Sequence, residues 1–311
     1  MQNSGVDEKN PNDIKMTVPG ADFDKTLDLL TTGFGFRIEM IFPADSPSTA
    51  VVSGHGTAIR LDAEEEPTKV ETPSEWVIGR AGMQYRDLIP GRFGGRVIAS
   101  HIRILDGGTV PDYVHFHKID FQMIYCVRGR IRVVYEDQGG PFWLEPGDCV
   151  LQPPEIRHRV LEAEANSEVV EIGMPAAHET WADHDLKLPT EHIKSDKDFR
   201  GQRFVRHIAA NAVWQRSGNA DVLVRDTGIS SATGGFANVC VLRTVAVTDL
   251  PANHANCREI IFYFVIKGSI QTALNGDFGR ELTAGDSILV PRGHESGLKA
   301  AENSEILSVT V

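Results

Sequence analysis

The stretch "HFHKIDFQMIYCVRGR", from His115 to Arg130, places two histidines one residue apart. Residues two apart on a β-strand point to the same face, so the imidazoles of His115 and His117 would leave one side of the strand. In a closed barrel that side is the interior. Imidazole nitrogens are frequent ligands of divalent transition metals. The spacing therefore predicts the start of a metal site.

The elements around these histidines recur later in the chain. From Trp76 onward the sequence consists of short β-type runs bounded by Gly, Pro and Asp, which is typical of an all-β fold. The segment around His115 can be laid over a second segment at a nearly constant offset. The matched pairs are His115 with His254, Gly129 with Gly268, Gly147 with Gly285, and Pro153 with Pro291. Two copies of one all-β module are predicted.

The first copy resembles a known family. "GTVPDYVHFHKIDFQMIYCVRG" followed by "EPGDCVLQPPEIRH" is similar to the two conserved motifs of the cupin superfamily, and "YFVIKGSIQTALNGDFGRELTAGDSILVPRG" is similar to the same fold again. The resemblance covers residues 80–311 and implies a bicupin. The fold expected is all-β, with two cupin barrels in tandem, each a small antiparallel jelly roll (double-stranded β-helix).

The resemblance also implies a set of metal ligands. In cupins the chain path brings a third histidine, here His158, beside the first two, and the place of the acidic ligand is held here by Gln122. Three neutral imidazoles and an open position suit Fe(II), Mn(II), Ni(II), Cu(II) or Zn(II). The sequence does not choose among these ions, and Fe(II) is the favoured one.

Gln122 leaves three interpretations open. Its amide oxygen is a weaker metal ligand than a carboxylate, so it could bind the metal weakly or hydrogen-bond substrate or dioxygen. Asp120, two residues earlier and expected on the same strand face, could supply the missing carboxylate. The third interpretation is a site that has lost its function.

The second copy shows what a lost site looks like. At the positions aligned with the candidate ligands it has His254, Asn256, Ile261 and Ser296. One of four candidate ligands survives there, so the C-terminal barrel is predicted to be structural. The first copy keeps its histidines, and this contrast favours a functional first site.

Two more residues complete the set of candidate catalytic residues with Gln122 and Asp120. His101 lies on the strand-like run "VIASHIRI" and could face the barrel interior, the alternative being a buried core histidine. Arg103 is expected on the same face as His101. It could pair with a substrate carboxylate or form a salt bridge at the barrel rim.

The segment 14–63 reads as a strand, a helix and three short strands. Phe23, Leu27 and Leu30 have helical spacing. "LLTTGFGFRIEMIFP" resembles a single module of the vicinal-oxygen-chelate (glyoxalase/bleomycin-resistance) superfamily. Such modules work in pairs, and the first strand here has no His or Glu at the usual ligand place. The expected role is therefore structural, by covering the pocket or forming a dimer.

The sequence predicts six segments. These are a disordered tail (1–13), a glyoxalase-like α+β segment (14–63), an acidic linker (64–75), an N-terminal cupin with the metal site (76–180), a polar connector (181–200) and a C-terminal cupin without metal (201–311).

The formal charge of -12 and the absence of a run of Lys or Arg argue against nucleic-acid and membrane partners and favour a small-molecule substrate. The four cysteines have no CxxC spacing, which is typical of a reduced, cytoplasmic protein. No apolar signal sequence or membrane span is present. A homodimer is implied by the cupin resemblance.

The preferred function is a metal-dependent dioxygenase that acts on a small hydroxyaromatic or enolisable oxygenated compound, as the resemblance implies. One alternative is an isomerase or lyase that uses the same metal as a Lewis acid to stabilise an enolate. The other is a cupin that binds a small molecule without converting it.

Overall fold

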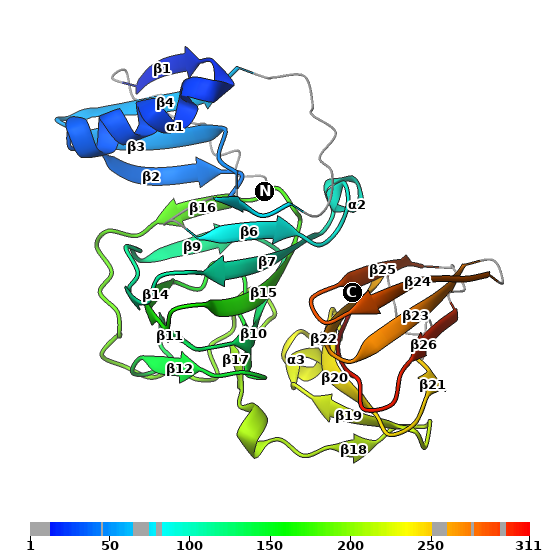
Figure 1. Ribbon diagram of the computed structural model, residues 1–311. Helices are drawn as coiled ribbons and strands as arrows, with labels where there is room; N and C mark the ends of the chain where they lie inside the picture. Colours follow the sequence, from blue (N-terminus) through cyan, green and yellow to red (C-terminus); the bar gives the residue numbers. More distant parts are fainter. Residues whose placement is uncertain are drawn as a thin grey trace, which may run out of the picture.

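The chain folds into three parts. The computed structural model describes residues 13–44, 46–64, 75–78, 83–250, 260–274, 277–292 and 297–311. Figure 1 shows an N-terminal α+β unit in blue, a first barrel in cyan to green and a second barrel in yellow to red. Apart from residues at their ends, the predicted tail 1–13 and linker 64–75 lie outside the described residues, so both stay predictions.

The N-terminal unit has one helix packed on a four-stranded arrangement in the order β1-β4-β3-β2. Phe23 and Leu30 are buried against the strands and Leu27 packs beside them, so the helical spacing seen in the sequence is confirmed. The predicted succession of a strand, a helix and three strands is also present, whereas the glyoxalase-like assignment stays a prediction. The elements are β1 (Asp13–Val18), η1 (Gly20–Asp22), α1 (Phe23–Asp28), η2 (Leu29–Gly33), β2 (Arg37–Phe42), β3 (Thr49–Gly54) and β4 (Thr57–Ala63).

The first barrel consists of two facing sheets. One has the order β16-β9-β14-β11-β12, with β8 beside β14, and the other has the order β17-β13-β10-β15-β7-β6-β5. The elements are β5 (Val77–Ile78), β6 (Gln84–Asp87), α2 (Arg92–Gly95), β7 (Ile98–Ile104), β8 (Gly108–Thr109), β9 (His115–Lys118), β10 (Phe121–Arg128), β11 (Ile131–Tyr135), β12 (Phe142–Leu144), β13 (Cys149–Leu151), β14 (His158–Ala163), β15 (Ser167–Met174), β16 (Glu179–Ala182) and β17 (Val205–His207).

The second barrel repeats this plan with sheets in the orders β18-β19-β20-β27-β22-β25 and β21-β26-β23-β24. The all-β, two-barrel fold is therefore confirmed. The elements are η4 (Ala209–Asn211), β18 (Gln215–Arg216), β19 (Val222–Asp226), α3 (Ile229–Ala232), β20 (Asn238–Thr244), β21 (Thr248–Asp249), β22 (Ile260–Lys267), β23 (Ser269–Leu274), β24 (Asp277–Thr283), β25 (Ser287–Pro291), β26 (Gly297–Ala300) and β27 (Glu305–Thr310).

Two glycines show how closely the two barrels match. Gly129 ends the turn after β10 with φ +64°, and Gly268 ends the turn after β22 with φ +80°. A Cβ at either position would overlap a serine, Ser167 in the first barrel and Ser304 in the second. A left-handed backbone and a close approach both require glycine, which explains why the repeat keeps it.

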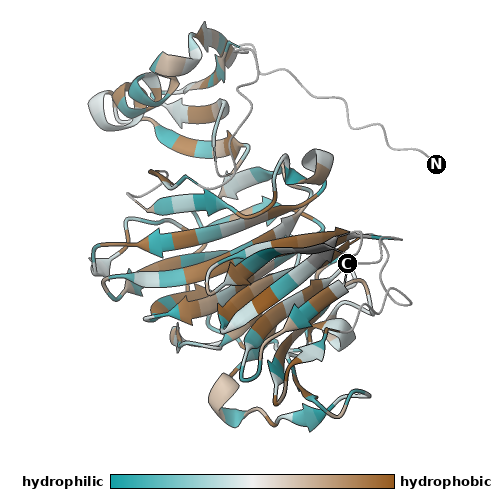
Figure 2. Ribbon diagram, turned by 45° about the vertical axis from the view of Figure 1, so that its right-hand side comes forward, coloured by the Kyte–Doolittle hydropathy of each residue, from teal (hydrophilic) through white to brown (hydrophobic). Residues whose placement is uncertain are grey.

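Side-chain alternation in β10 separates two cores. Phe121, Met123 and Tyr125 point out of the first barrel and pack against the second barrel, including Phe262 and Leu307. Gln122, Ile124 and Cys126 occupy the alternate positions and face the interior of the first barrel. Figure 2 shows hydrophobic segments in brown between hydrophilic ones in teal along the strands of both barrels. The sheet that joins the two barrels is thus also one wall of the first barrel's interior.

The sheet of the N-terminal unit continues into the first barrel. Met40 of β2 lies opposite Trp181 of β16, and Thr180 of β16 lies opposite His117 of β9. In Figure 1, β2 lies beside β16, which forms the top of the first barrel. The N-terminal unit is therefore an extension of the sheet that carries His115, His117 and His158.

Two strand assignments differ from the predicted segments. The predicted connector begins at residue 181, but Trp181 and Ala182 belong to β16, which pairs on both sides. β17 lies in the segment assigned to the C-terminal cupin, yet it pairs with β13 of the first barrel. Both strands are three or four residues long and depend on distant partners, so local sequence carries little signal for them.

Cys126 and Cys149 are free and buried, and Cys240 is free. Burial raises the pKa of each of these thiols to about 12, so they are poor nucleophiles. Among the described residues no helix combines the length and apolarity needed to cross a bilayer.

Candidate metal centre

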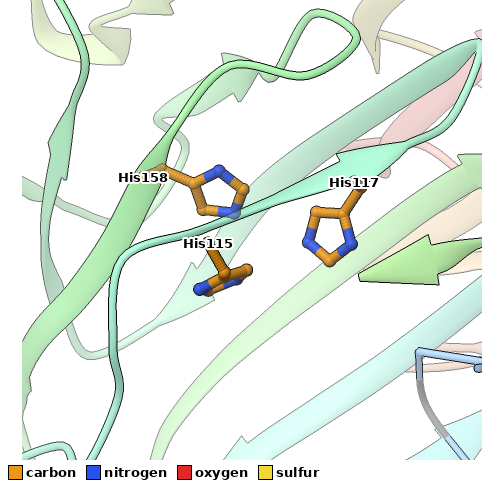
Figure 3. Close-up of side chains that lie close together, drawn as sticks. All are labelled: His115, His117 and His158. Carbon is orange, nitrogen blue, oxygen red and sulfur yellow. The ribbon is translucent and has the colours of Figure 1, made fainter. Parts of the chain in front are cut away.

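Three buried histidines meet inside the first barrel. His115 and His117 project from β9, and His158 opens β14 directly opposite His115 in the antiparallel pair. The candidate ligand atoms of all three lie within 4.8 Å of one another. Figure 3 shows the three imidazoles turned toward a common point. The strands thus bring together the three histidines that the sequence predicts as ligands.

Each imidazole is oriented by a hydrogen bond at Nδ1. His115 Nδ1 lies 2.8 Å from the carbonyl oxygen of Tyr113, and His158 Nδ1 lies 2.9 Å from that of Ile156. His117 Nδ1 lies 2.8 Å from Thr180 Oγ1. A carbonyl oxygen only accepts, so in His115 and His158 the Nδ1 atom carries the proton and Nε2 keeps its lone pair. The hydroxyl of Thr180 can donate or accept, so it orients the His117 ring with either tautomer.

This donor set fits a divalent transition metal. Imidazoles held by a partner at the second ring nitrogen are the usual form of histidine ligands, because that bond fixes the tautomer and the ring direction. Three neutral nitrogens close together in a buried site suit the first-row ions from Fe(II) to Zn(II). The geometry does not choose among these ions.

The histidines line a cavity of about 140 Å³. A cavity of roughly 150 Å³ is large enough to hold benzene, so this one suits a molecule with a single ring or smaller. Apolar side chains form most of the wall, among them Ile98, Ile102 and Val133. Ala44 of the N-terminal unit also borders the cavity, which places that unit beside the site.

A row of polar side chains forms the wall contributed by the second sheet. The row runs across four neighbouring strands and consists of Gln152 after β13, Gln122 on β10, Glu171 on β15 and Ser100 on β7. Gln122 Nε2 donates to Glu171 Oε1 at 2.6 Å. We call Gln152, Gln122, Glu171 and Ser100 the polar row.

Gln152 is the most buried member of the polar row, with 1% of its surface exposed. Its amide nitrogen and oxygen make no hydrogen bond with any described residue. A buried amide without partners is costly, so both atoms are available to a molecule in the cavity.

Gln122 lies in the cavity, as predicted, and is 2% exposed. One N–H of its amide nitrogen donates to Glu171, and its amide oxygen can accept from a ligand. The hydrogen bond to Glu171 could not be foreseen, since the two residues are distant in sequence.

Asp120 is not at the site. It lies exposed in a bend between β9 and β10, outside both strands, and does not line the cavity. The expectation that it shares a face with Gln122 assumed one unbroken strand, and the bend ends that alternation. Asp120 therefore does not replace the missing carboxylate ligand.

His101 and Arg103 also lie away from the cavity. They share a face of β7, as predicted, but it is the face opposite Ile102, which lines the cavity. His101 Nε2 lies 2.9 Å from Glu168 Oε2, and Arg103 Nε lies 3.1 Å from Glu168 Oε1. His101 thus fits the alternative of a buried core histidine and not the interior role, and Arg103 forms the salt bridge that was the alternative to pairing with a substrate.

His101 lies where the two barrels meet, with its ring edge-on to Phe264 of the second barrel. Arg86 Nη2 lies 3.1 Å from His101 Nδ1, so Nδ1 accepts and Nε2 carries the proton given to Glu168. Burial, together with the charge of Arg86, lowers the pKa of His101 from 6.5 to about 4. The ring is therefore neutral at pH 7.

We expect this histidine to make the protein less stable in mild acid. As the pH falls from 6.5 to 4, the unfolded chain takes up a proton at residue 101 and the folded chain does not, so the free energy of unfolding decreases. The variant His101→Gln keeps an acceptor and a donor but does not titrate. Urea denaturation at several pH values should show a smaller loss of stability in the variant; equal losses would contradict the assignment.

The second barrel lacks this arrangement where it can be examined. Ile261, aligned with Gln122, is buried in an apolar core. The other aligned positions, His254, Asn256 and Ser296, lie outside the described residues. The predicted structural role of this barrel therefore stays a prediction.

Sequence reasoning missed several residues at the site. Glu171, Gln152 and Tyr135 line the cavity, and Tyr135 stacks on His158 with ring centroids 5.6 Å apart. His178 lies with its ring 5.2 Å from His117. A polar residue in or next to an otherwise apolar run was the available signal for Glu171 and Gln152, since buried positions are rarely polar without a function.

Comparisons with known proteins agree with the fold. Residues 101–172 match the family model described as a cupin domain. The structure is similar to a salicylate 1,2-dioxygenase from Pseudaminobacter salicylatoxidans, with a TM-score of 0.55 and 13% identity over 73% of this chain and 75% of that one.

It is also similar to an oxalate decarboxylase from Lactobacillus farciminis in complex with formate. That likeness has a TM-score of 0.52 and 11% identity over 79% of this chain and 87% of the other. No curated protein sequence matches the chain. At these identities the likenesses establish the fold alone.

Proposed function

We propose that the first barrel is a metal-dependent enzyme site that acts on a small hydroxyaromatic or enolisable oxygenated compound, with dioxygenation as the preferred reaction. The observation that carries the proposal is the arrangement of His115, His117 and His158, which line one cavity and whose candidate ligand nitrogens lie within 4.8 Å of one another. The known activity of the similar salicylate 1,2-dioxygenase supports the choice of reaction.

The residues of the chain have separable tasks in this proposal. The three histidines hold the ion, and the hydrogen bonds at Nδ1 keep their rings in place. A divalent ion bound there supplies Lewis acidity and open positions for oxygen ligands. The polar row offers hydrogen bonds to oxygen atoms of the substrate, and the apolar wall excludes water.

An isomerase or lyase is the second candidate reaction. The observation that favours it is Glu171, a carboxylate that lines the same cavity as the histidines. Enolate chemistry combines a Lewis acid with a base, whereas dioxygenation also consumes dioxygen. A cupin that binds without converting its ligand is the remaining alternative.

Metal analysis followed by oxygen-consumption measurements separates these candidates. The protein would be reconstituted with Fe(II) under anaerobic conditions and assayed with catechols, gentisate-like acids and β-diketones. We expect stoichiometric iron and substrate-dependent loss of dioxygen. Conversion without dioxygen consumption would favour the isomerase or lyase, and protein without stoichiometric metal would refute the enzyme proposal.

A further inference from the structure

The hydrogen bond between Gln122 and Glu171 gives the cavity a carboxylate in a fixed orientation. Gln122 Nε2 donates to Glu171 Oε1 at 2.6 Å, and both residues line the cavity that holds the three histidines. An ionised carboxylate accepts hydrogen bonds at about four lone-pair sites, so it can take more than one donor at a time. The Gln122 bond helps to fix the Glu171 carboxylate beside the cavity.

Glu171 is outside the ligand group. The ligand atoms that lie within 4.8 Å of one another belong to His115, His117 and His158. Glu171 reaches the same cavity from β15, in the facing sheet. A molecule held against the histidines would therefore lie between them and this carboxylate.

The second barrel shows that the fold does not require these polar groups. Ile124 lies opposite Glu171 in the first barrel, and the matching pair in the second is Tyr263 with Ser308. Likewise Met123 lies opposite Leu151, and Phe262 lies opposite Leu289.

This register places Ile261 at the position of Gln122, Val290 at that of Gln152 and Ser308 at that of Glu171. The same positions are thus filled without a charge in a barrel of the same design. The carboxylate at Glu171 has a cost in a largely apolar cavity, and a function explains why it is kept there.

We propose that Glu171 accepts a proton from the substrate and that Gln122 positions the Glu171 carboxylate. The hydrogen comes from a hydroxyl group, or from a C–H bond next to a carbonyl. In the hydroxyl case the O–H bond breaks, the proton bonds to a carboxylate oxygen of Glu171, and the electron pair stays on the substrate oxygen. The inference rests on the proposed function and extends it, because it selects substrates with an ionisable hydroxyl or an enolisable centre.

The test uses the full chain loaded with zinc, an ion that cannot carry out redox chemistry. The probe is 4-nitrocatechol, because its neutral and ionised forms absorb light differently. Absorbance gives the number of probe hydroxyls ionised on binding, and calorimetry in two buffers gives the protons released. We call the number of hydroxyls ionised minus the number of protons released, per bound probe, the proton difference. If Glu171 takes up one proton, the proton difference of the wild-type protein is one. In Glu171→Gln this difference should disappear, and probe affinity should fall about tenfold to a hundredfold.

Two further variants complete the experiment. Glu168→Gln removes a charge from the same strand on its opposite face, where Glu168 contacts His101 and Arg103, and should behave as wild type. Glu171→Ser introduces the residue type that the second barrel has at the matching position, Ser308. It serves as the replacement if the Glu171→Gln protein does not fold.

The outcomes distinguish the two proposals. A proton difference that is the same in wild type and in both Glu171 variants would refute the role of Glu171 alone. Loss of zinc from Glu171→Gln would identify Glu171 as a metal ligand and would also refute the inference. Wild-type protein that binds no zinc would refute the proposed function, and the inference with it.

Discussion

Replacing His117 with alanine is expected to abolish stoichiometric metal binding and all metal-dependent activity. The His117 ring lies 5.2 Å from each of the other two ligand rings, measured between centroids, so its loss opens one side of the group. Changes to the outer partners of metal ligands already cost about 10-fold to 100-fold in affinity, so loss of a ligand should cost at least about 100-fold. Metal content after dialysis against a weak chelator measures the effect.

The matched control is His192→Ala. His192 is exposed in the connector, away from the cavity, so its removal should leave the metal content unchanged. A His117→Ala protein that retains a full equivalent of metal would show that the ligand set is wrong.

Replacing Gly129 with alanine should destabilise the first barrel by about 3 kcal/mol or more. The backbone at Gly129 has φ +64°, and a Cβ there would overlap Ser167 Oγ and lie 2.9 Å from Ser167 Cα. Ser167 cannot move away easily, because its hydroxyl accepts from Arg130 N at 3.1 Å and donates to Glu164 O at 2.8 Å. Urea denaturation measures the loss.

Gly91→Ala separates the cost of the left-handed backbone from the cost of the overlap with Ser167. Gly91 has a similar φ of +59°, but a Cβ there would meet no atom within 4 Å. The left-handed backbone alone should cost about 1–2 kcal/mol. Equal losses in the two variants would mean that the contact with Ser167 contributes nothing.

The two-barrel fold could be predicted because its turns require glycine at particular positions, and these glycines recur in both copies of the repeat. Gly129 and Gly268 need left-handed backbone, and Gly147 and Gly285 share φ +92°, so the repeat preserved them even where the surrounding side chains diverged. The short strands β16 and β17 have no comparable local signal in the sequence, because their pairing partners are far away in the chain.

The candidate site could be predicted in part. His115 and His117 share one strand, so alternation alone places them together. Glu171 and Gln152 meet Gln122 only through strand pairing, and sequence spacing contains no information about which residues become cross-strand neighbours. The predicted role of Asp120 relied on alternation along a single strand. A bend at Asp120 interrupts that alternation, so the spacing was misleading there.

The pairing of β2 with β16 has a consequence for how the protein avoids self-association. Without residues 13–64, β16 would be an open edge whose unpaired N–H and C=O groups could template the addition of a strand from another molecule. β2 covers that edge, and β16 in turn carries Thr180, which orients His117. A truncation designed to isolate the barrels should therefore retain β2, because aggregation would otherwise begin beside the histidines that define the site.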